Sequence, residues 1–338
     1  MVRRPLFNDG ALAREFGARP STVASVRTRL EERGFLRRLF IPPPAALGAA
    51  VLSIGLGSLP AEGPAELSRA LGRGLFQADE CDSFWAVAGP FAWLEMGAFR
   101  SYSDARRRGD WLPRMLEALP GVAAGTSERS PLPVEHVRFH NLFDFAPLLS
   151  GHFRLRPPAA AAKPVPPAPA RRLSPLEKLC LYGLVRRPGA SDRETAGELG
   201  VSRQAVARAR PLLVREGRLI PAVVPDLRRL GLGILAVHRF RLDGRTGPEA
   251  AEAQAAGILG ALPHFFAVSA GTELVVVAAY RDIASFGREA PRTAPPAGAG
   301  APSDTPDVRT IMLDDAIVVR DLDFVPFVKS ALGLDIAD

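Results

Sequence analysis

Side chains suited to reading DNA gather on one predicted helix in the second half of the chain. Gln204, Arg208 and Arg215 lie on one face of the predicted helix, and Arg203 stands at its start, after Ser202. The opposite face carries the apolar residues Val206, Ala209 and Leu213. A guanidinium group pairs with guanine edges, an amide pairs with adenine, and hydroxyl groups contact phosphates. The pattern therefore predicts a recognition helix that begins after its Ser202 cap.

A related pattern occurs close to the first residue of the chain. Gly17 can form a tight turn, and the helix predicted after it carries Ser21 and Ser25 on its outer face, with Arg19 near its start. The β-prone segments 35–41 and 218–224 follow the two predicted recognition helices and are expected to form wings that contact the DNA backbone. The expected DNA-binding residues are Arg19, Ser21, Thr22, Ser25, Arg37, Arg38, Ser202, Arg203, Gln204, Arg208 and Arg218.

These two patterns belong to an internal repeat. Arg3-Arg4-Pro5 aligns with Arg186-Arg187-Pro188, and the register continues without a gap to Leu47-Gly48 and Leu230-Gly231. After small register shifts, Ala98-Phe99-Arg100 aligns with Ala279-Tyr280-Arg281, and residues 143–147 align with 322–326. The same segments in the same order predict a chain built from two copies of one unit.

Each copy is expected to open with a helix-turn-helix. In the second copy Ser174-Pro175-Leu176-Glu177 has the features of a helix start, and Gly200 can end the next helix. Pro211 lacks an amide donor and its ring clashes with the preceding turn, so only the first two turns of the recognition helix are predicted. Nothing in the first copy corresponds to the helix expected at 175–185. That unit is therefore incomplete, borrows a helix, or begins upstream.

Each copy is expected to close with elements in the βαββαβ order of a ferredoxin-like domain. The elements expected in the first copy are a strand at 49–56, a helix at 62–75, strands at 83–88 and 91–99, a helix at 103–119 and a strand at 134–143. Those expected in the second copy are a strand at 234–242, a helix at 248–262, strands at 265–269 and 273–280, a short helix from Asp282 and strands within 308–319. One face of such a sheet is free to pair with another sheet.

The predicted fold class is α+β, a tandem repeat of a winged helix-turn-helix followed by a ferredoxin-like βαββαβ domain. The predicted domains are a winged helix-turn-helix at 1–47, a ferredoxin-like domain at 48–150, a Pro/Ala-rich linker at 151–173, a winged helix-turn-helix at 174–230 and a ferredoxin-like domain at 231–338. A further stretch of low complexity, 290–306, is expected to be disordered. The ferredoxin-like sheets are expected to associate with each other, within one chain or in a homodimer.

One run of residues resembles the Lrp/AsnC family of transcriptional regulators. The run is Leu213-Val214-Arg215-Glu216-Gly217-Arg218-Leu219-Ile220, followed by Pro225-Asp226 and Leu230-Gly231. Val87-Ala88-Gly89-Pro90-Phe91 is similar to the hairpin that borders the effector pocket of that family. The resemblance implies double-stranded DNA as a partner and a small effector near Gly89, Phe91 and Gly271. Ala92 stands where the family usually has an acidic residue, so the alternatives to an amino-acid effector are another small molecule or none.

The same architecture occurs in siroheme decarboxylases, which makes an enzyme the main alternative. His136 and His140 would share one face of a strand and could ligate a metal or contact a tetrapyrrole. Neither histidine recurs in the second copy, and no partner stands at metal-ligand spacing, so we expect no metal site, no cofactor and no catalytic residue. The sequence thus predicts a DNA-binding transcriptional regulator and not an enzyme. A tetrapyrrole enzyme and an interaction adaptor that does not bind DNA are the alternatives.

Composition and charge agree with this prediction. The 338 residues include 43 basic and 36 acidic side chains, a net charge of +7, which favours a polyanionic partner. Cys81 and Cys180 show no disulfide or metal spacing, so a cytoplasmic location is expected. Residues 39–61 are uncharged and long enough to cross a bilayer, but the aligned stretch of the second copy holds Asp226, Arg228 and Arg229. No contact with a membrane is therefore expected.

Overall fold

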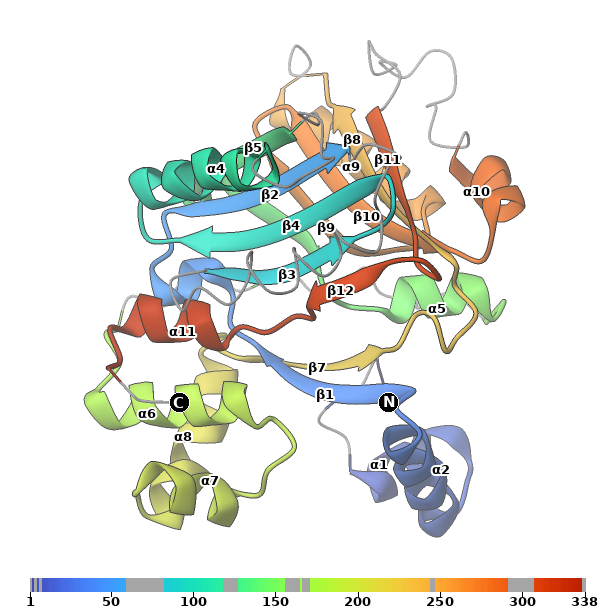
Figure 1. Cartoon of the computed structure of the whole chain (residues 1–338). Coiled ribbons are helices and arrows are strands. Elements are labelled where there is room, and N and C mark those ends of the chain that lie inside the picture. Colours follow the sequence, from blue (N-terminus) through green and yellow to red (C-terminus); the bar gives the residue numbers. More distant parts are fainter. Residues whose placement is uncertain are drawn as a thin grey trace. The chain divides into compact units, whose positions relative to one another are not determined.

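The computed structural model describes residues 8–58, 82–117, 127–155, 171–243, 247–290 and 307–335, together with residues 2, 5 and 165. The fold is α+β, as the sequence predicts (Figure 1). Two compact units form, and each combines segments from both halves of the chain. Unit 1 contains residues 1–41, 139–165 and 220–308, and unit 2 contains residues 42–138, 166–219 and 309–338.

Three capped helices of unit 2 agree with the helices expected in the second copy. They are α6 (Pro175–Arg186), α7 (Asp192–Leu199) and α8 (Arg203–Arg215). Ser174 and Ser191 each form a capping box, and Ser202 accepts a hydrogen bond from the Ala205 amide. Gly200 ends α7 in the left-handed conformation (φ 65°), which allows the tight turn into α8.

The predicted interruption of α8 at Pro211 is wrong, because the helix continues through that residue to Arg215. The buried side chains Val206, Ala209 and Leu213 fix one face of α8 against its neighbours, while Pro211 lies on the exposed side. Packing of the apolar face on both sides of the proline thus offsets the missing amide donor.

The first copy begins with two helices of unit 1, α1 (Asp9–Phe16) and α2 (Pro20–Glu32). Asn8 caps α1, and Gly17 ends it in the left-handed conformation (φ 63°). Leu12 and Ala13 pack against Val23 and form a small core between the two helices. The described residues of this unit show no counterpart of α6 before α1.

The segments predicted as two separate wings pair with each other instead. In unit 1, β1 (Leu36–Ile41) and β7 (Ile220–Pro225) form an antiparallel two-stranded ribbon in which Leu36 lies opposite Pro225 and Ile41 opposite Ile220 (Figure 1). The prediction of wings was wrong because the sequence shows that each segment favours a strand but does not show its partner.

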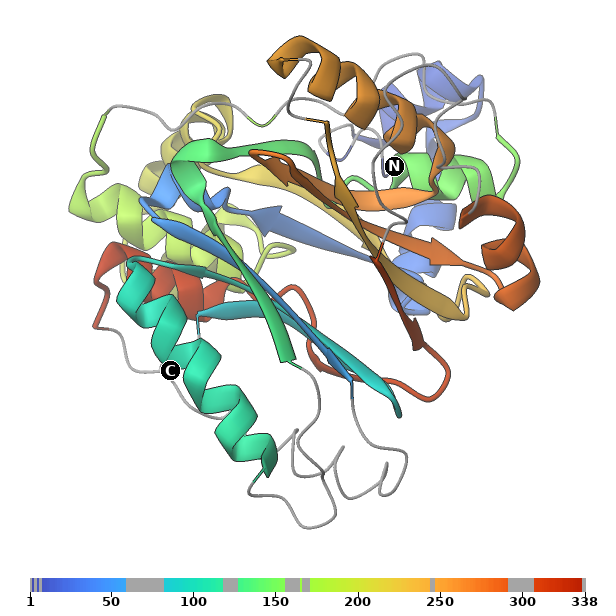
Figure 2. The same cartoon turned by 90° about the horizontal axis from the view of Figure 1, so that it is seen from above.

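The sheet of unit 2 has the strand order β12-β3-β4-β2-β5. Its strands are β2 (Val51–Ser58), β3 (Ser83–Ala88), β4 (Ala92–Phe99), β5 (Ser127–Pro133) and β12 (Ile317–Arg320). Helix α4 (Tyr102–Glu117) lies along one face of this sheet, as Figure 2 shows. The described part of the unit also includes the short helices η1 (Pro44–Leu47), η3 (Val134–His136) and α11 (Val325–Leu332).

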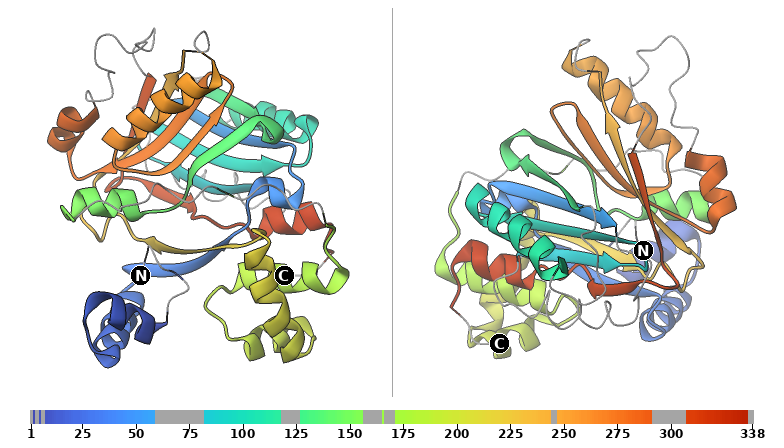
Figure 3. Two further views of the ribbon diagram at one scale, coloured as in Figure 1. Left: turned by 180° about the vertical axis from the view of Figure 1, so that it is seen from behind. Right: turned by 45° about the horizontal axis from the view of Figure 1, so that its top comes forward.

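The other five-stranded sheet has the order β11-β8-β10-β9-β6. Its strands are β6 (Val137–Leu142), β8 (Ile234–Arg241), β9 (His264–Ala270), β10 (Glu273–Tyr280) and β11 (Asp307–Met312). In unit 1, α9 (Pro248–Ala261) covers one face, and its Ala255 and Ile258 pack on Phe240, Leu274 and Val276 of the strands (Figure 3). Helices α5 (Ala146–His152) and α10 (Ile283–Glu289) also belong to unit 1.

The last strand of each copy joins the sheet of the other copy. The predicted strand at 134–143 is corrected: β5 completes the first copy's own sheet, whereas β6 pairs with β9 of the second copy. The predicted strands within 308–319 likewise separate into β11, beside β8, and β12, which pairs with β3. Each exchange pairs a strand of one half of the chain with the sheet of the other half, which local sequence patterns cannot show.

The same stacked pair of phenylalanine rings follows each exchanged strand, and we call this contact the aromatic hook. Phe145, just before α5, stacks on Phe265 with ring centroids 4.6 Å apart, and Phe324, just before α11, stacks on Phe84 at 4.8 Å. Asp144 and Asp323 accept hydrogen bonds from the first amides of these helices, Ala146 and Val325. The two hooks correspond to the aligned segments 143–147 and 322–326, and each lies within one unit.

Some expected features lie outside the described residues. They are the helix at 62–75, nearly all of the low-complexity stretch 290–306, most of the linker at 151–173 and Cys81. In the part of the chain that the structure describes, no helix is both long enough and apolar enough to cross a membrane.

Candidate functional site

A buried carboxylate lies near the middle of β4 in unit 2. Glu95 is only 1% exposed and receives two arginine side chains, one on each carboxylate oxygen. Arg108 Nη2 donates to Oε1 at 2.6 Å, and Arg129 Nη2 donates to Oε2 at 2.6 Å. The Ser83 hydroxyl also donates to Oε1, and Arg129 Nη1 donates to the Ser53 hydroxyl at 3.0 Å. We refer to Ser53, Ser83, Glu95, Arg108 and Arg129 as the charge cluster.

Sheet register brings the charge cluster together under α4. Gly55 of β2 lies opposite both Glu95 of β4 and Arg129 of β5, so these side chains emerge on the same face. Arg108 reaches this face from α4, one turn after Ala105, which packs on the sheet through Phe99 and Val51. Four strands and one helix thus supply the five side chains.

In the part of the chain that the structure describes, the charge cluster joins two guanidinium groups to the carboxylate of Glu95. Burial alone raises the pKa of Glu95, but Arg108 and Arg129, together with hydrogen bonds from Ser83 and Arg129, outweigh burial and lower this pKa to about 2. Glu95 is therefore ionised at neutral pH. The side chains of Arg108 and Arg129 are 9% and 13% exposed, so water screens their charges poorly. Buried guanidinium groups of this kind are suited to binding a carboxylate.

The sequence analysis missed this site. Glu95, Arg108 and Arg129 come from separate elements, and no motif joins them. A signal was present in the repeat: the register that aligns Ala98-Phe99-Arg100 with Ala279-Tyr280-Arg281 places Val276 at the position of Glu95 and Glu289 at that of Arg108. Two charged residues of one copy that are apolar or of opposite charge in the other indicate a role confined to one copy.

Residues expected to contact DNA from the second copy lie on the surface of unit 2. Ser202, Arg203, Gln204 and Arg208 are all exposed along the first turns of α8. The ion pair of Arg210 with Asp192, at 2.8 Å, joins α8 to α7 beside this surface. The geometry agrees with the expected positions of the side chains, and their contact with DNA stays a prediction.

The corresponding residues of the first copy lie on α2 and β1 in unit 1. Arg19, Ser21, Thr22 and Ser25 are exposed at the start of α2. On β1, Arg37 is half-buried and Arg38 forms an ion pair with Glu31 at 2.9 Å. These six residues therefore belong to one unit, while the α8 residues belong to the other.

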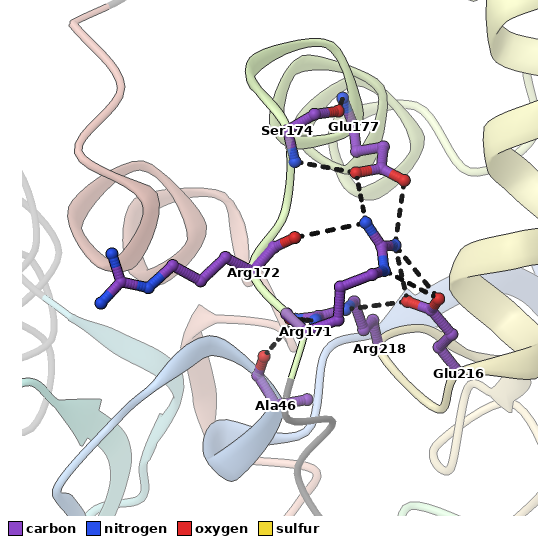
Figure 4. A network of polar contacts seen from close by, with 7 residues as sticks. All are labelled: Ala46, Arg171, Arg172, Ser174, Glu177, Glu216 and Arg218. Carbon is purple, nitrogen blue, oxygen red and sulfur yellow. Dashed lines mark hydrogen bonds and ion pairs between the residues drawn. The ribbon is translucent and has the colours of Figure 1, made fainter.

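Arg218 does not have the surface position expected of a wing residue. Only 4% of it is exposed, because its guanidinium group donates to the carbonyl oxygens of Ala46 and Arg171 inside unit 2 (Figure 4). Its Nε also donates to Glu216 at 3.2 Å. The expected contact of Arg218 with the DNA backbone is therefore corrected: the residue is a buried cross-link.

Arg171 joins the same network from the linker side. Its guanidinium group donates to both oxygens of Glu177, at 2.9 Å each, and to both oxygens of Glu216, at 2.9 and 3.1 Å (Figure 4). Hydrogen bonds from Arg171 and from the Ser174 amide lower the pKa of Glu177 to about 2. These contacts connect the end of the linker to the start of α6 and the end of α8.

The residues expected near an effector lie at two hairpin turns, one in each unit. Gly89 is buried between β3 and β4, and its amide donates to the Ala92 carbonyl at 2.8 Å, whereas Phe91 is 58% exposed. Gly271 connects β9 and β10 with a positive φ of 59°. The structure thus places them in turns, as expected, and a role in binding an effector stays a prediction.

The histidines predicted to share a strand face do not do so. His136 is exposed in η3, and only His140 lies on β6, where its Nε2 is 2.8 Å from the Ser269 hydroxyl. Within the described ranges, no three residues of the types His, Cys, Asp and Glu form a group that could hold a metal ion. His238 is fully buried in unit 1, with Nε2 3.0 Å from the Tyr280 hydroxyl, and burial lowers its pKa to about 4.

The chain matches no protein-family model and no curated protein. Two structures of the siroheme decarboxylase NirDL, one in complex with an iron-uroporphyrin III analogue, are similar to 96% of this chain and 92% of theirs, at 14% identity and a TM-score of 0.47. E. coli AsnC is similar to 42% of this chain over 93% of its own, at 13% identity and a TM-score of 0.33. A transcriptional regulator from Neisseria meningitidis in complex with L-Met is similar to 42% of this chain over 90% of its own, at 18% identity and a TM-score of 0.33.

These neighbours include two of the three classes of protein that the sequence analysis named. Two structures that match nearly the whole chain are those of an enzyme, so the expectation that this chain is not an enzyme is corrected. The similarity is distant, and it assigns no role to any residue of this chain.

Proposed function

We propose that this chain is an enzyme that binds a tetrapyrrole through its carboxylate groups and decarboxylates one of them. The observation that carries the proposal is the pair of buried guanidinium groups in the charge cluster, where Arg108 and Arg129 both contact the carboxylate of Glu95. Siroheme and uroporphyrins carry acetate and propionate side chains, which match this charge.

Decarboxylation needs a bound carboxylate, a leaving CO2 and a proton. The bond between the methylene carbon and the carboxylate carbon breaks, CO2 departs, and the electron pair that stays on the methylene carbon takes up a proton, so no oxidant is consumed. Arg108 and Arg129 would hold and orient the anion, and Glu95 would hold the two guanidinium groups in place. Because the pKa of Glu95 is lowered to about 2, its carboxylate has no proton to give at neutral pH.

The proposal is tested with siroheme and with iron-uroporphyrin III. We expect iron-uroporphyrin III to change its visible absorbance on binding, and siroheme to lose the mass of CO2 when incubated with the protein without oxygen. Arg108→Gln should weaken binding at least tenfold, whereas Arg106→Gln, an exposed neighbour on α4, should bind like the wild type. An unchanged absorbance spectrum together with an unchanged siroheme mass would rule this function out.

A second candidate function, sequence-specific DNA binding, is favoured by the surface of α8. The exposed Arg203, Gln204 and Arg208 lie on a helix whose opposite face is buried and whose start is fixed by the Ser202 cap. In this proposal the two copies are helix-turn-helix units joined to ferredoxin-like domains, in a cytoplasmic regulator that associates through its sheets and responds to a small effector.

Promoter DNA that includes the region around the protein's own gene tests this second function. We expect a salt-dependent mobility shift that weakens at least tenfold in Arg203→Ala with Arg208→Ala. Arg193→Ala, an exposed arginine on α7, is the matched control. If the double variant binds the DNA as tightly as the wild type, α8 does not read it.

A further inference from the structure

Two buried N–H groups near the charge cluster point to a ligand. Neither Trp93 Nε1 nor Arg129 Nε has a hydrogen-bond acceptor among the residues that the structure describes. The side chains of both residues are buried, with Trp93 only 6% exposed. A buried donor without an acceptor costs about 1–3 kcal/mol, so a folded protein usually supplies one. An acceptor from a bound molecule would remove this cost.

Glycines make room for these two side chains. An added Cβ at Gly57 would lie 2.2 Å from Trp93 Nε1, and one at Gly55 would lie 3.0 Å from the Trp93 ring and 3.2 Å from Arg129 Nη2. On the helix side, a Cβ at Gly109 of α4 would lie 3.5 Å from Arg129 Nε. The indole ring therefore lies flat along β2 from Gly55 to Gly57, and the guanidinium group passes between β2 and α4.

Apolar side chains fill the corresponding position of unit 1. In the aligned register, Gly55 and Gly57 correspond to His238 and Phe240, and Trp93 corresponds to Leu274. Phe240 and Leu274 pack with Val276 against α9, and His238 donates to or accepts from Tyr280. Glu289 stands in place of Arg108. Unit 1 thus has an apolar core and the opposite charge where unit 2 has glycines and two arginines.

We propose that, among the described residues, unit 2 and not unit 1 holds a carboxylate-binding site, in which Arg129 Nε and Trp93 Nε1 donate to an organic carboxylate beside Arg108. The site rests on the proposed function and deepens it, because it assigns named donors to one carboxylate of the tetrapyrrole. A free polycarboxylate is the other source of the same chemistry, and the experiment separates the two. The chain would bind one such ligand, not two.

Equilibrium titration of the full-length protein provides the test. The probes are iron-uroporphyrin III, followed by absorbance, and mellitate, a benzene ring that carries only carboxylates, followed by calorimetry. Trp93→Phe removes one N–H donor and keeps an aromatic ring, and we expect it to weaken binding about fivefold to tenfold. Trp85→Phe is the matched control, because Trp85 is also buried but pairs with Met96 on β4 rather than with Glu95.

A second variant keeps the test independent of folding defects at Trp93. Gly55→Ala adds a methyl group against the Trp93 ring and Arg129, and we expect it to weaken binding at least tenfold. His238 is the residue of unit 1 that aligns with Gly55, and His238→Gln should leave binding unchanged. Thermal denaturation of each variant shows that it is folded at the temperature of the titration.

The outcomes distinguish this site from the proposed function. Binding of one equivalent of iron-uroporphyrin III, weakened in Trp93→Phe and Gly55→Ala as expected, supports both. Mellitate binding with this dependence, without any binding of iron-uroporphyrin III, supports the carboxylate site and overturns the tetrapyrrole function. Iron-uroporphyrin III binding that neither variant changes overturns the site and leaves the function standing. Two equivalents per chain would also overturn the proposal of a single site.

Discussion

Glu95 is the residue on which the charge cluster depends. Its carboxylate contacts both Arg108 and Arg129, so Glu95→Gln removes a negative charge that two buried guanidinium groups share. We expect this variant to lose about 3 kcal/mol of unfolding free energy at pH 7. Urea denaturation measures the loss. Glu128→Gln, whose side chain is 49% exposed next to Arg129, should change stability by less than about 1 kcal/mol.

The same residue predicts a dependence on pH. The pKa of Glu95 falls from its ordinary value of 4.5 to about 2 in the folded protein, so on acidification the unfolded chain takes up the proton first. The stability that Glu95 contributes is therefore present above pH 4.5 and is lost as pH falls toward 2. The difference between wild type and Glu95→Gln should shrink in this window, and a difference that stays constant down to pH 3 would contradict the prediction.

His238 predicts a second pH effect, in unit 1 and at a higher pH. Burial lowers its pKa from 6.5 to about 4, so below pH 6.5 the unfolded chain binds a proton that the folded chain does not. Stability should fall by up to about 3 kcal/mol between pH 6.5 and pH 4. His238→Gln should lose this slope, while His136→Gln, on an exposed side chain, should keep it. Equal slopes in all three proteins would show that His238 does not titrate as described.

At the scale of elements, the aromatic hooks hold the exchanged strands. Phe145 stacks on Phe265 in unit 1, and Phe324 stacks on Phe84 in unit 2, with the rings 11° and 22° from parallel. Phe145→Ala and Phe324→Ala should each lower the unfolding free energy by about 3–4 kcal/mol, because each removes a buried ring from a contact between the two halves of the chain. Phe91→Ala, on an exposed side chain, should change it by less than about 1 kcal/mol. A loss below 1 kcal/mol in either hook variant would show that the hook does not hold its strand.

Elements set by short-range signals were predictable from the sequence, and strand partners were not. Ser174, Ser191 and Gly200 mark helix ends through bonds to residues three or four positions away, and the structure has α6, α7 and α8 where these residues place them. The partners of β6 and β12 depend on contacts between residues more than a hundred positions apart, for which alternating apolar residues give no information. The charge cluster was missed for the same reason, because its arginines meet Glu95 only through sheet register and the packing of α4.

For the whole molecule, strand exchange predicts that the two halves of the chain hold together without the linker. The N-terminal half supplies β6 to the sheet that contains β9, the C-terminal half supplies β12 to the sheet that contains β3, and β1 pairs with β7. A protease site inserted in the segment 157–164 allows the chain to be cut after folding. We expect the two fragments to co-elute from a gel-filtration column in native buffer and to separate only in denaturant.

The linker then contributes mainly through effective concentration. When the halves are joined, the strands of one half meet those of the other at a local concentration of the order of millimolar, whereas in the cut protein that concentration falls to the concentration in solution. The stability of the cut protein should therefore rise with protein concentration, while that of the intact chain should not. Phe145→Ala together with Phe324→Ala should promote separation of the fragments, because both hooks cross between the halves. If the two wild-type fragments separate in native buffer at micromolar concentration, the exchanged strands do not hold the molecule together.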